Sequence, residues 1–246
     1  GSVIFIDETH AALPAMMWPQ AWCWLKVLAE EWKCRVVFAS GSMIRFWEDE
    51  AIIKPSVKLP ELTPLRVISS NQELESDRLR IEKAEDGALN CANLSERLAN
   101  HLMDCEKEGP VLCILNTVQS AAGVAQALAQ RLDHFDPLAF DDEPELAQRR
   151  VLHLSTALSS SDRELIIREI ETRNTEHREN WILVATSCVE AGVDLDFQTG
   201  YRERCSVASL IQTSGRVNRH SLRSGAVLFD FVTVEDGVLS QHPAFK

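Results

Sequence analysis

Short, uninterrupted apolar runs alternate along this chain with longer segments of helical periodicity, and this alternation is the feature that most restricts its fold. The apolar runs have the length and composition of parallel strands that are buried on both faces. They lie at residues 3–6, 36–39, 111–115, 151–154, 182–185 and 226–232. Strands that alternate with helices in this way predict an α/β protein with a doubly wound parallel sheet.

Helical periodicity is clear in several of the intervening segments. Pro19 stands where a helix would begin, and apolar side chains then recur on one face as far as residue 32. Leucines spaced four residues apart predict a helix over 94–102, and alanine and leucine predict another over 121–132. Ser161, with Glu164 three residues later, has the spacing of a capping box and predicts where the next helix starts.

Residues 54–64 contain three prolines and little helical periodicity, so we interpret them as a linker. Residues 1–53 hold only two predicted strands, which would form part of a first domain. Residues 65–246 hold enough strands and helices for a complete second domain. The chain is therefore predicted to carry one whole α/β domain and a portion of another.

Charge and cysteine content restrict the partners and the compartment of the chain. A net charge of −12 argues against nonspecific adhesion to nucleic acid, although it is compatible with a narrow groove lined by amides and hydroxyls. The seven cysteines are scattered without a C-x-x-C pair, which predicts reduced core thiols in a cytoplasmic protein. We expect no signal peptide and no membrane-spanning segment, because no apolar stretch is long enough.

An acidic pair follows the first predicted strand. Asp7 and Glu8 would lie at the carboxyl end of that strand, where open parallel sheets place their sites. Asp7 would hold Mg²⁺ and Glu8 would orient an attacking water, although an ordinary turn can contain the same two residues. Ser40 and Ser42 follow the next strand and would present their hydroxyls at the same edge.

Polar residues also follow strands in the second predicted domain. Asn116 and Thr117 come after one apolar run and Thr186 after another, so the two hydroxyls should emerge at one edge of the sheet. Hydroxyl contacts suit a phosphodiester backbone and would give a shallow salt dependence. Gly192 and Asp194 follow in an expected turn, where the aspartate would face a nucleotide. A strand that simply turns into another strand explains the same pattern.

The most specific pattern lies near the end of the sequence. Gln212, Arg216 and Arg219 are spaced four and three residues apart, which places them on one face of a predicted helix. The opposite, core-facing side would carry Val207, Leu210, Ile211 and Ser214. Guanidinium groups suit the charge of a γ-phosphate, although an ordinary solvated face can contain the same arginines.

Taken in chain order, these segments resemble the motif series of superfamily 2 helicases. Residues 7–10 are similar to the D-E-x-H box and residues 40–42 to the S-A-T motif. Residues 186–194 are similar to T-x(n)-G-x-D, and residues 212–219 to Q-x-x-G-R-x-x-R. Within the superfamily, the chain looks most like the CRISPR-associated helicase–nuclease of type I systems. That likeness rests on Asn116-Thr117-Val118 with Ala121, Leu154-Ser155-Thr156 with Arg163, and Gly215 to His220.

The resemblance implies an ATP-driven motor that moves 3′-to-5′ on single-stranded DNA and unwinds DNA during foreign-DNA degradation. It implies two RecA-like domains with ATP and Mg²⁺ bound between them, and a guide-RNA surveillance complex as partner. The implied metal and catalytic residues are Asp7, Glu8, Gln212, Arg216 and Arg219, with Gly192 and Asp194 also at the nucleotide. The implied DNA contacts are Asn116, Thr117 and Thr186. The residues implied to couple the two domains are His10, Ser40 and Ser42.

The sequence also departs from that family. The family carries a nuclease domain, a phosphate-binding loop with lysine and an accessory domain, and none of these is recognisable here. Gly41 and Ser42 stand where alanine and threonine are usual. We therefore expect a portion of such an enzyme, from motif II through motif VI, that is inactive alone. Two other hypotheses stay open: another superfamily 2 motor such as a DEAH-type RNA helicase, and a recognition or interaction module without catalysis.

Overall fold

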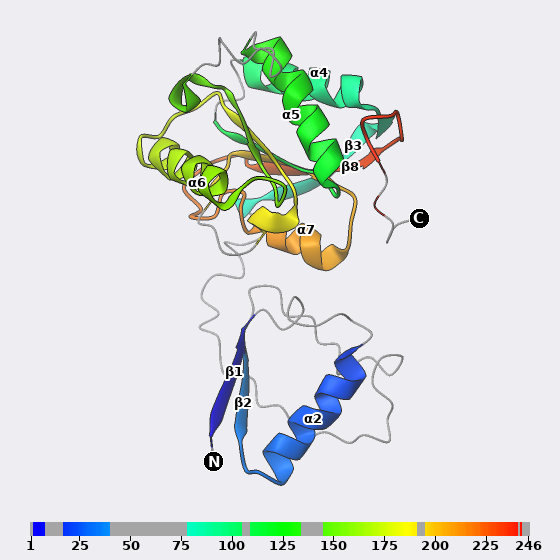
Figure 1. Ribbon diagram of the computed structural model, residues 1–246, viewed down its shortest axis with the longest axis vertical. Helices are drawn as coiled ribbons and strands as arrows, with labels where there is room; N and C mark the ends of the chain where they lie inside the picture. The colour runs from blue at the N-terminus through cyan, green and yellow to red at the C-terminus, as the bar shows by residue number, and fades with distance from the viewer. Residues whose placement is uncertain are drawn as a thin grey trace. The chain divides into compact units, whose positions relative to one another are not determined.

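The computed structural model describes residues 2–7, 17–39, 78–104, 109–133, 145–190, 195–240 and 242. The chain divides into two compact units, residues 1–71 and 72–246, which are drawn in Figure 1. The predicted linker 54–64 lies outside the described residues, as do six predicted site residues: Glu8, His10, Ser40, Ser42, Gly192 and Asp194.

The described part of the first unit consists of two parallel strands and one helix. These are β1 (Val3–Asp7), α2 (Trp18–Glu30) and β2 (Arg35–Ala39). Trp22 of α2 stacks on Phe38 of β2, with ring centroids 5.7 Å apart. The prediction that both strands are buried on both faces is wrong for β1, in which Phe5 is 74% exposed. Among the described strands, β1 pairs with β2 alone, so one of its edges has no neighbour there.

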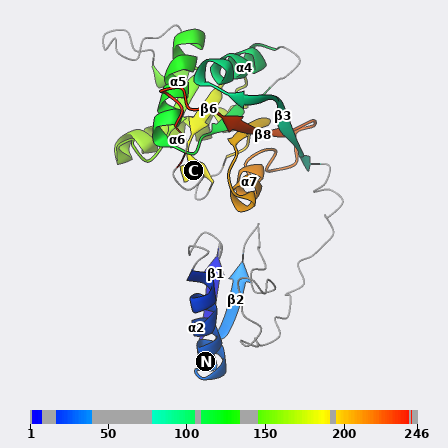
Figure 2. The same cartoon turned by 90° about the vertical axis from the view of Figure 1, so that its right-hand side faces the viewer.

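The second unit contains a parallel sheet of six strands in the order β3-β8-β7-β4-β6-β5, seen from a second side in Figure 2. The strands are β3 (Arg80–Leu89), β4 (Val111–Ile114), β5 (Val151–Leu154), β6 (Ile182–Ala185), β7 (Thr199–Glu203) and β8 (Val227–Thr233). The sequence predicted four of them but missed β3 and β7. β3 is polar because it is an edge strand, and β7 contains a glycine and two charged residues.

Helices cover both faces of this sheet, as Figures 1 and 2 show. The helices are α4 (Cys91–Met103), α5 (Val118–Leu132), α6 (Ser160–Thr175) and α7 (Val207–Ser214), with short 3₁₀ turns η3 (Leu146–Gln148) and η4 (Ser187–Val189). α4 and α5 pack on one face, and α6 and α7 lie on the other. The predicted doubly wound arrangement is therefore confirmed.

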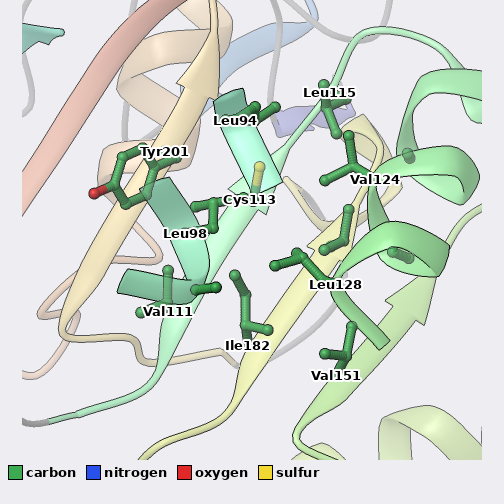
Figure 3. Packing of buried hydrophobic residues seen from close by; sticks show 14 of the residues in the cluster. Leu94, Leu98, Val111, Cys113, Leu115, Val124, Leu128, Val151, Ile182 and Tyr201 are labelled. Atoms are coloured by element: carbon green, nitrogen blue, oxygen red, sulfur yellow. The ribbon is translucent and has the colours of Figure 1, made fainter. Parts of the chain in front are cut away.

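The core is divided by the sheet because side chains alternate along each strand. In β4, Val111 and Cys113 pack with α4 and α5, whereas Leu112 and Ile114 pack on the α6 side. Figure 3 shows the first of these clusters, in which leucines and a valine of α4 and α5 meet the strand residues. All four β4 side chains are fully buried, as expected of a central parallel strand.

The start of α6 differs from the prediction. Its N-cap is Ser159, whose hydroxyl accepts a hydrogen bond from the backbone N–H of Asp162 at 3.1 Å. Ser161 already lies inside the first turn. The prediction mistook the last of three consecutive serines for the cap, because each of them can cap a helix.

Two further predictions concern the state of the cysteines and the presence of membrane-spanning segments. Six cysteines lie in the described ranges and all are free, while Cys105 lies outside them. Burial raises the pKa of the Cys113 thiol well above its ordinary value, so this thiol stays protonated in the core. Among the helices that the structure describes, none is both long and apolar enough to cross a membrane.

Candidate functional site

In the first unit, one predicted metal ligand can be placed. Asp7 ends β1 and is paired with Ala39, the last residue of β2, so both strands end at the same edge. A carboxylate oxygen at that edge has the hard-ligand chemistry that Mg²⁺ prefers. The described residues contain no group of three or more His, Cys, Asp or Glu side chains that could hold a metal. Of the two predicted magnesium ligands, the described residues include only Asp7.

In the second unit, the predicted DNA-contacting residues emerge at the carboxyl edge of the sheet. β4 and β6 are parallel neighbours, with Ile114 opposite Ala185. Asn116 and Thr117 follow β4, and Thr186 follows β6. The register therefore brings the two loops to one edge, which is where open parallel sheets carry their ligand sites.

The two hydroxyls have different surroundings at this edge. Thr117 is the N-cap of α5: its hydroxyl accepts from the backbone N–H of Ser120 at 3.1 Å and lies 3.1 Å from the hydroxyl of Ser240. Thr186 is 6% exposed and precedes η4. Thr117 thus has a structural task besides any contact with a ligand, since an N-cap satisfies a helix N–H that has no partner within the helix.

A buried arginine of β7 occupies the centre of this edge. Arg202 is 2% exposed and lies opposite Ile114 in the register of β7 with β4. Its Nη1 donates to Oδ1 of Asn116 at 2.7 Å, and its Nη2 donates to Oγ of Ser209 in α7 at 2.9 Å. Its Nε lies 3.1 Å from Oε1 of Glu190 in a buried ion pair.

Glu190, which follows η4, is the second charged member of this cluster. Its Oε1 also accepts from the hydroxyls of Ser209 at 2.6 Å and Thr213 at 3.3 Å, both in α7. Its backbone carbonyl accepts from Nη2 of Arg216 at 2.8 Å. Glu190 therefore ties the loop after β6 to α7 and to the first predicted phosphate-binding arginine.

Glu203 completes the polar edge on the side of β8. Its Oε2 accepts from the backbone N–H of Asn116 at 2.7 Å, and its Oε1 accepts from the hydroxyl of Thr233 at 2.7 Å. The side-chain amide of Asn116 donates to the carbonyl of Arg204 at 2.9 Å. Asn116 is thus held from several directions, which fixes the loop that starts after β4.

The helix that was predicted to carry Gln212, Arg216 and Arg219 on one face is shorter than expected. α7 ends at Ser214 and Gly215 is its C-cap, so only Gln212 lies within it. Arg216 and Arg219 follow in a turn, because Val217 leaves the helical path to form a β-bridge with Phe197.

The predicted core face of α7 is also wrong in part. Val207 is 72% exposed and Ile211 38%, whereas Thr213 is fully buried and Leu210 packs on the core. Thr213 can be buried because its hydroxyl donates to Glu190, a partner that the helical spacing of α7 does not reveal.

Asn218 shapes the turn that precedes Arg219. Its backbone has φ = 49°, in the left-handed region that asparagine tolerates better than most residues, and its side chain is 2% exposed. Its amide donates to the carbonyls of Arg78 and Arg223, and its Oδ1 accepts from the N–H of Arg223. The backbone N–H of Arg219 donates to Asp196 at 2.7 Å. The position of Arg219 is therefore set by contacts far away in the sequence.

Sequence reasoning missed the residues that organise this edge, namely Glu190, Arg202, Glu203, Ser209, Thr213 and Asn218. The first three are charged residues outside any apolar run, and nothing in their spacing reveals that they are buried. Only Asn218 carries a local signal, since an asparagine after a helix-ending glycine favours a left-handed turn.

Residues 107–222 match the family described as CRISPR-associated nuclease/helicase Cas3, C-terminal. This match covers α5, α6, α7 and the strands from β4 through β7, and so includes Asn116, Glu190, Arg202 and Glu203 of the polar edge. These residues of the second unit are thus similar to the C-terminal region of Cas3-type helicases. No curated protein matches the chain significantly.

Solved structures share the fold of the chain at low sequence identity. A crystal structure of T. fusca Cas3 with AMPPNP has a TM-score of 0.64 and 20% identity, and the match covers 96% of this chain and 30% of that one. A chain of a CRISPR RNA-guided surveillance complex, pre-nicking, has a TM-score of 0.63 and 19% identity, covering 98% and 32%. The DUF1998 helicase MrfA bound to DNA and AMPPNP has a TM-score of 0.57 and 15% identity, covering 95% and 31%.

These likenesses confirm the predicted RecA-like fold. The chain spans only about 30% of the length of the Cas3 structure that it matches. Activities and partners of the whole Cas3-type protein are therefore proposals for this chain.

Proposed function

We propose that the chain forms part of an ATP-driven motor that moves 3′-to-5′ on single-stranded DNA and unwinds DNA during the degradation of foreign DNA. The observation that carries this proposal is the polar edge of the second unit. There, residues of three helicase-like motifs are joined by the contacts of Arg202 and Glu190. The motor function belongs to the full-length protein.

The strand contact would be made by Asn116, Thr117 and Thr186. All three follow parallel strands at the edge where such sheets bind ligands, and their amide and hydroxyl groups can hold phosphates without reading bases. A chain with a net charge of −12 cannot depend on bulk attraction to DNA. We therefore propose little sequence preference and a shallow salt dependence for this domain.

The nucleotide contact would be made by Gln212, Arg216 and Arg219, with Gly192 and Asp194 contributing from their loop. Guanidinium groups fit phosphate oxygens through paired hydrogen bonds, so these residues have the right chemistry for the phosphates of ATP. Bound ATP with Mg²⁺ would supply the phosphoryl group that is transferred to water. On the first unit Asp7 would hold the metal and Glu8 would orient the water, and His10, Ser40 and Ser42 would couple hydrolysis to movement.

The partners proposed for the full-length protein are single-stranded DNA and a guide-RNA surveillance complex. The surveillance-complex structure that shares this fold supports the second partner, and the DNA-bound helicase structure supports DNA as the first, without specifying single strands. A pull-down of full-length protein with the guide-RNA complex tests the second partner separately from motor activity.

The motor is tested by alanine substitution of Arg216 and Arg219 in the full-length protein. Each substitution should lower DNA-stimulated ATP hydrolysis by roughly 10³–10⁵-fold, the range found when such arginines are removed from related motors. Affinity for single-stranded DNA should stay near that of the wild type. Lysine should not restore turnover if the contact is bidentate. Near wild-type turnover in either alanine variant would mean that this arginine lies on an ordinary solvated surface.

A matched control is Arg168→Ala on α6, because Arg168 is exposed and its ion pair among the described residues is with Glu164 of the same helix. It should leave hydrolysis unchanged. The same assay separates the alternatives: stimulation by single-stranded RNA but not DNA would favour an RNA helicase. Loss of all hydrolysis in the wild type, with partner binding retained, would favour an interaction module.

A further inference from the structure

Arg202 is a buried charge whose partners belong to three different segments of the chain. At 2% exposure its guanidinium has given up almost all of its hydration, which is tolerated only when such a group is paired and hydrogen-bonded. One nitrogen binds Asn116 after β4, one binds Ser209 in α7, and the third faces Glu190 after η4. These three segments hold the proposed DNA and nucleotide contacts.

The geometry of the guanidinium makes these contacts dependent on one another. Its nitrogens are fixed in one plane, so a shift of Ser209 that carries the guanidinium along also changes the contact to Asn116. Glu190 strengthens the link, since it binds Ser209 and Thr213 through its carboxylate and Arg216 through its carbonyl. If only some members of a buried polar network moved, the others would lose their partners at a high cost in free energy. The members of this network are therefore expected to move together.

We infer that Arg202, paired with Glu190, is a positioning residue that couples the nucleotide-contacting segment after α7 to the DNA-contacting loop after β4. This inference rests on the proposed function. A change at Arg216 on nucleotide binding passes through Glu190 to Arg202 and from there to Asn116. Arg202 itself contacts neither ligand. Energetic coupling through a contiguous set of contacts of this kind is reciprocal, so DNA at the loop also changes nucleotide turnover.

Another buried arginine shows what a purely structural role looks like. Arg173 is also 2% exposed and forms a 2.7 Å ion pair with Glu169, but both lie on α6 one turn apart. Arg173 also lies over the ring of Trp181 and donates to the carbonyl of Leu146. None of these partners is a proposed DNA or nucleotide contact, so the pair provides a matched control.

The test compares two double variants of the full-length protein, Arg202→Met with Glu190→Gln and Arg173→Met with Glu169→Gln. Removing both charges avoids leaving one of them buried and unpaired. ATP hydrolysis is measured with and without single-stranded DNA, together with the KM for ATP and the Kd for DNA. In the first variant DNA stimulation should fall about tenfold, within the 5–150-fold range of typical couplings. The loss should appear in kcat at saturating DNA and not in KM.

Arg202→Lys provides a second measurement, because it keeps the charge beside Glu190 but loses the planar fork, and it should also lower DNA stimulation. The Arg173 variant should keep wild-type stimulation, even if it unfolds at a lower temperature. Folded Arg202 variants with wild-type stimulation would overturn the inference while leaving the motor function intact. Equal loss in both double variants would also overturn it, since the effect would then be general destabilisation. A wild type that lacks DNA-stimulated hydrolysis would contradict the proposed function, and the inference with it.

Discussion

At the scale of single residues, the buried polar side chains of this domain take part in its architecture as much as the apolar ones do. Asn218 hydrogen-bonds backbone groups of Arg78 and Arg223 and so holds the turn that presents Arg219, and Arg202 contacts side chains from three segments. Neither residue is a proposed ligand contact. Their burial is possible because most of their polar atoms find a hydrogen-bond partner and the Nε of Arg202 faces the Glu190 carboxylate, which offsets the cost of leaving water.

Replacing Asn218 by alanine should lower the free energy of unfolding by about 4 kcal/mol. Three hydrogen bonds of about 1 kcal/mol each are lost, and alanine is less favourable at a positive φ. Denaturation in urea measures the change. Asn180→Ala is the control, because Asn180 is exposed with φ = 60° and should lose only the conformational part, about 1 kcal/mol. Equal losses in the two variants would show that the hydrogen bonds of Asn218 contribute little.

At the scale of secondary-structure elements, the ends of helices and strands carry the site. α5 begins at Val118, directly after its N-cap Thr117 and the neighbouring Asn116, and α7 ends at Ser214, just before Arg216. Gly200 in β7 shows how closely these elements pack. A Cβ added there would lie 2.6 Å from Leu228 and 2.8 Å from Val217, both buried. The segment after α7 therefore lies directly against β7, which also carries Arg202.

The cap of α5 makes the role of Thr117 testable, provided that stability and binding are separated. Thr117→Val should destabilise the protein by about 1 kcal/mol through loss of the N-cap and should weaken binding of single-stranded DNA. Thr117→Ser keeps the hydroxyl and should retain both. Thr186→Val removes a hydroxyl with no cap to lose and should weaken DNA binding alone. Affinity of the full-length protein is measured against salt concentration, and unchanged affinity in both valine variants would place the DNA track elsewhere.

At the scale of the whole molecule, the second unit contains a six-stranded sheet with helices on both faces, whereas the described part of the first unit is two strands and a helix. The proposed function distributes its residues over both units. ATP hydrolysis requires the metal, the attacking water and the phosphate contacts to be in place at the same time.

A protein made of these 246 residues alone should not hydrolyse ATP at a motor-like rate. The sequence contains no glycine-rich loop with lysine, and in such motors that loop supplies the backbone N–H groups and the charge that hold the β- and γ-phosphates. Hydrolysis is measured at saturating single-stranded DNA, with the full-length protein as the positive control. DNA-stimulated turnover by the 246-residue chain would mean that other residues hold the phosphates.

The sequence by itself determined the fold class and most of the strands. Continuous apolar runs are a local signal for buried parallel strands, and they located β4, β5, β6 and β8 together with the two strands of the first unit. They could not reveal β3 or β7. Arg202 of β7 is buried because Glu190 pairs with its charge, and Glu203 because Asn116 and Thr233 hydrogen-bond it, and no pattern within β7 contains that information.

The sequence also located the segments of the candidate site, because the spacing of residues such as Gln212 and Arg216 is a local property. Only the tertiary structure decided how those segments are held. The bridge between Val217 and Phe197 ends α7 before the arginines, and Glu190 joins that segment to the loop of Asn116 through Arg202. A hydrogen bond between residues that are far apart along the chain leaves no periodic trace in the sequence, so it becomes visible only once the sheet has brought its partners to one edge.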